Sequence, residues 1–158
     1  MYKELHVYDL DMTLYRSPEP TENDPAFYYH AHSFGTVKGP GFDRRWNLDT
    51  IAKARHSGVV QSVMNIVLTA RPDHDQMRRK IEYMISLTGI EFDKILLRPI
   101  TYPGPIPKYK AACVAGLLTK HPSIEKVVMV DDDEDNLNEV KRSVEAHGRL
   151  YAGLHPLE

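Results

Sequence analysis

The stretch Glu4-Leu5-His6-Val7-Tyr8-Asp9-Leu10-Asp11-Met12-Thr13-Leu14 decides the fold of this chain. Its first five residues are mostly apolar or aromatic and predict a short strand. Two aspartates and a threonine follow at alternate positions, where the strand ends. Ligands of open parallel sheets bind beyond the carboxyl ends of the strands, so Asp9, Asp11 and Thr13 are the first candidates for a functional site.

Four further segments share this short apolar character and predict strands: Val63 to Leu68, Lys94 to Leu97, Lys126 to Val130 and Arg149 to Leu154. Helical spacing between them predicts four helices: from Asn47 as N-cap to Gly58, through Met77 and Ile81 to a capping Gly89, from about Lys110 to Thr119, and through Leu137 and Val144 to Gly148. This alternation predicts a doubly wound, Rossmann-like α/β fold. We expect a mainly parallel five-stranded sheet with helices on both faces.

Composition narrows the class of protein. The 158 residues are 42% apolar, which predicts a single domain spanning 1–158. A formal net charge of -2 gives no general attraction to polyanions or membranes. Cys113 is the single cysteine, and no segment approaches the roughly twenty apolar residues of a membrane span. We therefore expect a cytoplasmic protein with no membrane contact and no obligate protein partner.

The segment Tyr15 to Arg45 interrupts the alternation of strands and helices. It holds prolines at 18, 20, 25 and 40, several glycines, and no sustained helical or strand period. It reads as an ordered, loop-like insertion after the first strand.

The ends of two later predicted strands are also polar. Thr69 and Arg71 follow the second strand, and Asp131 and Asp132 follow the fourth. Carboxylates that converge repel one another unless a hard cation lies among them, so the set implies a Mg²⁺ site. Taken alone, the Asp9-x-Asp11 pair also fits ordinary turn chemistry.

The order of these residues resembles the four motifs of the haloacid-dehalogenase (HAD) superfamily. Under that resemblance, Asp9 is the nucleophile that forms an aspartyl-phosphate, and Asp11 is the general acid and base. Magnesium is held by an Asp9 oxygen, the backbone carbonyl of Asp11, and Asp131 or Asp132. The resemblance leaves open which of these last two aspartates binds the metal.

The remaining site residues also follow from the resemblance. Thr69 supplies the phosphate-binding hydroxyl, with amides near Ala70 at the start of the next helix as further donors. The motif lysine is Lys110 or Lys108, and Lys110 is preferred because an apolar helical run begins after it. The substrate and its phosphate are assigned to Thr13, Arg71, Arg45 and Trp46.

The insertion bears on the substrate because it takes the place of a full cap domain. Aromatic residues lie beside arginine and lysine near Trp46, a mixture that suits stacking on a nucleic-acid end. Packing of these aromatics onto the sheet is the alternative. Phrases such as Tyr15-Arg16-Ser17-Pro18 and Thr69-Ala70-Arg71 are similar to the RNA-repair HAD branch and to the 3'-phosphatase domain of phage polynucleotide kinase-phosphatase.

The sequence therefore predicts a Mg²⁺-dependent phosphomonoesterase. The resemblance implies that its substrate is an RNA or DNA terminus carrying a 3'-phosphate or a 2',3'-cyclic phosphate. The alternatives are a phosphatase of nucleotides or small metabolites, and a binding module that keeps the fold without catalysis.

Overall fold

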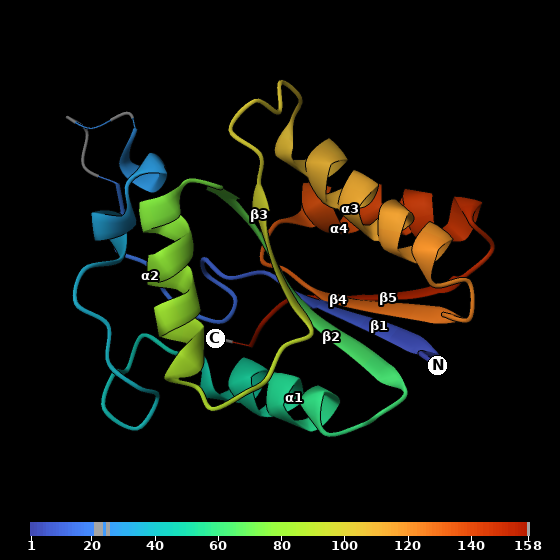
Figure 1. The fold of residues 1–158 in the computed structure, drawn as a ribbon, viewed down its shortest axis with the longest axis horizontal. Helices are drawn as coiled ribbons and strands as arrows, with labels where there is room; N and C mark the ends of the chain where they lie inside the picture. The colour runs from blue at the N-terminus through green and yellow to red at the C-terminus, as the bar shows by residue number, and fades with distance from the viewer. Residues whose placement is uncertain (21–23, 25, 158) are drawn as a thin grey trace.

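The computed structural model describes residues 1–20, 24 and 26–157; positions 21–23 and 25 of the predicted insertion, and residue 158, lie outside the described part. Its centre is a five-stranded sheet in the order β3-β2-β1-β4-β5, with every neighbouring pair parallel (Figure 1). The strands are β1 (Glu4–Tyr8), β2 (Val63–Pro72), β3 (Lys94–Arg98), β4 (Lys126–Val130) and β5 (Leu150–Leu154). The predicted sheet is confirmed, and it is parallel throughout.

Helices cover both faces of the sheet. They are α1 (Leu48–Gly58), α2 (Asp75–Ser86), α3 (Ile106–Lys120) and α4 (Glu134–Ala146). In Figure 1, α1 and α2 lie on one face and α3 and α4 on the other. Each face has its own apolar cluster, and these are represented by Ile81 of α2 and by Val114 of α3. Because β2 contacts both clusters, it is buried at nearly every position, as expected for a central parallel strand.

Two element boundaries differ from the predicted ones by several residues, and other ends differ by a residue or two. Strand β2 continues past Leu68 to Pro72, with a register shift against β3 over this stretch. Thr69 and Arg71 therefore belong to the strand, and α2 begins only at Asp75. Helix α3 begins at Ile106, before the predicted start at Lys110, because a proline in the first helical turn loses no hydrogen bond.

The insertion contains two short 3₁₀ helices, η1 (Phe27–Tyr29) and η2 (Ala31–Phe34), where the sequence predicted no clear helix. Phe34 is fully buried and packs edge-on against Tyr15, which in turn packs on Trp46. This contact joins the insertion to the cluster under α1 and α2. Tyr28, by contrast, is 41% exposed, so the insertion has both a packed side and an open one.

No helix in the described ranges is long and apolar enough to cross a membrane.

Candidate active site

The carboxyl ends of the neighbouring strands β1 and β4 bring two aspartates together. Asp9 follows β1 and Asp131 follows β4, and these strands pair in parallel with Tyr8 opposite Val130. The Asp9 amide donates to the Val130 carbonyl at 3.0 Å, which continues the ladder to the edge of the sheet. Both carboxylates are buried there, so each needs a partner that compensates its charge.

Lys110 provides this compensation. Its ammonium group is 1% exposed and donates to Asp9 Oδ1 at 2.9 Å and to Asp131 Oδ2 at 2.8 Å. Lys108, the other candidate, points away and pairs with Glu139 on the surface. The structure therefore brings Lys110, and not Lys108, to the predicted nucleophile.

Burial and charge shift the pKa values in opposite directions. Burial raises the pKa of Asp9 well above its ordinary value; Lys110 opposes this rise and Asp131 adds to it. Burial by itself would lower the pKa of Lys110, but the attraction of Asp9 and Asp131 outweighs it and raises that pKa. Burial also raises the pKa of Asp132. Lys110 is therefore held as the cation. For Asp9 and Asp132, burial still disfavours the charged form.

The same carboxylates fit a hard divalent cation. Oxygens of Asp9, Asp131 and Asp132 lie within 4.8 Å of one another. Asn136 donates to Asp131 at 3.2 Å, and its own Oδ1 is buried without a partner in the described part of the chain. Mg²⁺ prefers oxygen ligands of this kind, so the donor set suits it. The Asp11 side chain is not in this cluster; the resemblance assigned only its backbone carbonyl to the metal.

Thr13, which was expected to bind phosphate, places its hydroxyl against Asp9, the predicted nucleophile. It is fully buried and donates to Asp9 Oδ2 at 3.1 Å, while Lys110 holds Oδ1. The carboxylate is thus oriented through both oxygens. The turn between Asp11 and Thr13 passes through Met12 at a φ of 60°, in the left-handed region that favours glycine.

Arg71 makes contacts that the sequence did not predict. Its Nε and Nη2 donate to the two oxygens of Asp11 at 2.8 and 2.6 Å, and its Nη1 donates to the Tyr28 carbonyl at 3.1 Å and to Ser33 Oγ at 2.5 Å. The guanidinium also lies over the Phe34 ring, 4.0 Å from its centroid. In this structure Arg71 therefore joins Asp11, the predicted general acid, to the insertion. Its side chain also lines the cavity over the carboxylates, and its contact with phosphate stays a prediction.

Three further predicted residues are held by structural contacts. Thr69 is fully buried, and its hydroxyl accepts from the Arg71 amide at 3.1 Å. Because α2 begins at Asp75, the segment after Thr69 is strand and offers no helical amides. Arg45 makes an ion pair with Asp43 at 2.9 Å, and the Trp46 indole donates to the Lys38 carbonyl at 2.7 Å. Arg45 and Trp46 both line a cavity, and their contacts with substrate stay a prediction.

A cavity of about 600 Å³ opens over the site. Its wall includes Asp9, Lys110 and Asp132 from the strand ends and α3, and Tyr28 and Tyr29 from the insertion; we call it the reaction cavity. Both tyrosines are more than two-fifths exposed, so aromatic faces border the carboxylate cluster.

Arg98 is a lining residue that the sequence analysis missed. It is the last residue of β3, and its Nε donates to the Ala70 carbonyl at 3.1 Å. Its two terminal nitrogens have no hydrogen-bond partner among the residues the structure describes, and the side chain borders the reaction cavity. The strand-end rule that selected Asp9 and Asp131 applies equally to β3 and would have found it.

The fold and this strand-end cluster define a domain of the haloacid-dehalogenase class. More specifically, the chain belongs to HAD domain family 1 in Swiss Army Knife RNA repair proteins, whose model matches residues 23–149. The match starts after Asp9 and Asp11, so the placement of these two residues comes from the structure. Membership in this family indicates phosphatase-type chemistry in general.

Two solved structures share the fold. One is the HAD domain of the effector protein Lem4 from Legionella pneumophila, an inactive mutant, with a TM-score of 0.61, 13% identity, and 98% of this chain and 86% of that chain covered. The other is the Pnkp1/Rnl/Hen1 complex, with a TM-score of 0.64, 16% identity, and 99% and 47% covered.

A curated relative is the uncharacterized protein YMR265C of Saccharomyces cerevisiae. It is 24% identical over 159 residues, which cover 82% of this chain and 34% of the relative. The chain thus spans about a third of the length of that protein.

Proposed function

We propose that this chain is a Mg²⁺-dependent phosphomonoesterase that acts on nucleic-acid ends through a phosphorylated Asp9. The observation that carries the proposal is the buried cluster of Asp9, Asp131 and Lys110, in which Asp9 and Lys110 border the reaction cavity. A carboxylate held through both oxygens and bordered by a cavity has the geometry of a positioned nucleophile.

In the proposed reaction, one Asp9 oxygen attacks phosphorus and the ester oxygen leaves with its electron pair. Asp11 donates a proton to that oxygen, then removes one from the water that hydrolyses the aspartyl-phosphate. Bound Mg²⁺ would offset the repulsion between the carboxylate and the phosphate, held by Asp9 and by Asp131 or Asp132. Lys110 lies 2.9 Å from Asp9, opposes the rise in the pKa of Asp9 that burial causes, and adds a fixed positive charge.

Charge favours a further role for Arg98. With Asp11 protonated, as a general acid must be, the charged carboxylates at the site are those of Asp9, Asp131, Asp132 and Asp133. Lys110 and Arg71 supply two positive charges against them. With one Mg²⁺ this set is neutral, so a phosphate dianion would bring an uncompensated charge of about -2. The terminal nitrogens of Arg98 are placed to take part of it, as planar donors suited to phosphate oxygens.

A nucleic-acid end is the proposed substrate because of the wall above the carboxylates. Tyr28 and Tyr29 are exposed aromatic residues on this wall. Arg71 lies over one face of the Tyr28 ring and His74 packs against Tyr29, so the opposite ring faces would be the ones to stack on a base. The family membership supports the same substrate class, since the family is named for RNA repair. A terminal 3'-phosphate or 2',3'-cyclic phosphate is the specific group proposed.

The test measures phosphate release from 3'-phosphorylated oligonucleotides and from nucleoside monophosphates. Activity should require Mg²⁺, stop on chelation, and favour the oligonucleotides. Asp9→Asn should lower kcat by at least about a hundredfold, because it removes the nucleophile. Asp75→Asn, an exposed acid at the start of α2, is the matched control and should leave kcat unchanged. Full activity of Asp9→Asn would refute the mechanism, and a preference for mononucleotides would refute the substrate class.

A further inference from the structure

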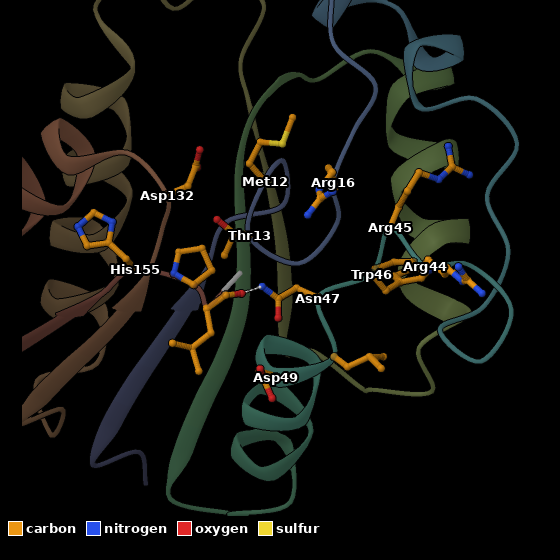
Figure 2. A pocket seen from close by; sticks show the side chains of 13 residues that line it. Met12, Thr13, Arg16, Arg44, Arg45, Trp46, Asn47, Asp49, Asp132 and His155 are labelled. Carbon is orange, nitrogen blue, oxygen red and sulfur yellow. Dashed lines mark hydrogen bonds between the residues drawn. The ribbon is translucent and has the colours of Figure 1, made fainter.

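A second cavity of about 600 Å³ adjoins the reaction cavity. The two share Met12 and Asp132 in their walls, so they meet beside the carboxylate cluster. The second cavity extends along the segments 12–16 and 44–49 to the C-terminal residues His155 to Leu157. In Figure 2, Arg16 lies between Asp132 on one side and Arg44 on the other.

Two arginines on this wall have side chains without a partner among the residues that the structure describes. Arg16 and Arg44 are exposed, and neither side chain makes a hydrogen bond or ion pair with any residue in the described ranges. Arg45 differs because Asp43 neutralises it. Among the described residues, the acids on the wall are Asp49 and Asp132, and Asp132 belongs to the carboxylate cluster that suits a cation.

The second cavity also exposes apolar side chains. Leu48 is 62% exposed and Leu157 is 61% exposed. The Leu157 backbone is held against the wall, since Asn47 Nδ2 donates to its carbonyl at 2.5 Å (Figure 2). Cations beside apolar surface suit a nucleotide chain, which has anionic phosphates and bases with flat π-faces.

We propose that the second cavity binds the single-stranded chain that continues from the terminal nucleotide. Arg16 and Arg44 contact successive backbone phosphates, while the terminal phosphate occupies the reaction cavity. The inference rests on the proposed function and extends it: the enzyme recognises a polymer, and its affinity rises with the length of the substrate.

Binding tests this without turnover. Asp9→Asn protein with Mg²⁺ is titrated into fluorescent single strands of about one to ten nucleotides that carry a 3'-phosphate. The longest strands approach the length that one single-strand-binding domain typically covers. Anisotropy gives the Kd for each length. We expect Kd to fall with length, and Arg16→Ala/Arg44→Ala to raise Kd roughly tenfold for the longer strands. In the Arg16→Ala/Arg44→Ala variant, the slope of log binding constant against log salt concentration should become shallower by about 1.4, which is roughly 0.7 for each of two lost phosphate contacts.

The matched control is Arg79→Ala/Arg142→Ala, which removes the same charge from exposed positions outside both cavities. It should retain the length dependence. Equal losses in the two double variants, or a Kd that does not change with length in the parent, would overturn the inference. The proposed function fails separately, if wild-type protein releases no phosphate from any phosphomonoester.

Discussion

Replacing Arg71 with lysine tests whether the hydrogen bonds of this residue hold Asp11 and the insertion together and stabilise the fold. Arg71 has its side chain 1% exposed and donates to four acceptors: two oxygens of Asp11, the Tyr28 carbonyl and Ser33 Oγ. A lysine keeps the charge but has neither the planar fork nor the face that stacks on Phe34. At least one charged hydrogen bond and the cation–π contact are lost, so Arg71→Lys should cost about 2–4 kcal/mol.

The chain contains a matched control for this change. Arg78 grips Asp73 with the same two-point geometry, both contacts at 3.0 Å, but the two side chains are 37% and 38% exposed. An exposed pair of this kind contributes about 0–1 kcal/mol, so Arg78→Lys should change stability by no more than that.

Urea denaturation followed by circular dichroism measures both variants, compared through the free energy of unfolding at unchanged m-value. Limited proteolysis supplies a local readout, because Arg71→Lys should speed cleavage within 15–45 while Arg78→Lys should not. If the two variants lose the same stability, within about 0.5 kcal/mol, then burial and the contacts to the insertion do not matter as argued.

Three further predictions concern single residues. Met12→Gly should raise the free energy of unfolding by about 0.5–1 kcal/mol, because Met12 has a φ of 60°; a lower thermal midpoint would contradict this. Arg45 holds the pKa of Asp43 below its ordinary value, so the carboxylate stabilises the fold above about pH 4 and loses this effect as the pH falls through the folded pKa. Asp43→Asn should therefore lower the free energy of unfolding by about 1.5–3 kcal/mol at pH 7, and by progressively less as the pH falls. Urea denaturation at each pH measures this loss, and a loss that does not change with pH would contradict the prediction. Lys110→Met should lower kcat by at least about a hundredfold in phosphate-release assays, because it removes the buried positive charge at the site. Lys108→Met should leave kcat unchanged because Lys108 lies on the surface; the opposite result would show that Lys108 is the motif lysine.

The sheet was accessible from the sequence because its strands are short apolar runs with polar ends. Both β1 and β4 have the predicted bounds. Strand β2 was predicted too short, since Thr69 and Arg71 look like loop residues until the register with β3 shows that the strand continues. The convergence of Asp9 and Asp131 also followed from parallel strands alone, because their carboxyl ends share one edge. The extent of the domain over 1–158 stays a prediction.

Side-chain partners depended on helix phase and packing, which the sequence left undetermined. Lys108 and Lys110 are separated by about 200° around a helix, so only one can face the sheet. The start of α3 at Ile106 and its packing decide which. Arg71 has the planar donor group expected of a phosphate ligand, and in the fold these donors form hydrogen bonds with Asp11 and the insertion.

The Asp9-x-Asp11-x-Thr13 motif shows the same division. The residue types and their position at a strand end determined which groups reach the site. Tertiary structure decided the contact that each group makes there: Lys110 and Thr13 orient Asp9, and Arg71 holds Asp11. Alternation along a strand encodes the direction of a side chain, whereas a buried charge pairs with whichever opposite charge the fold brings within reach.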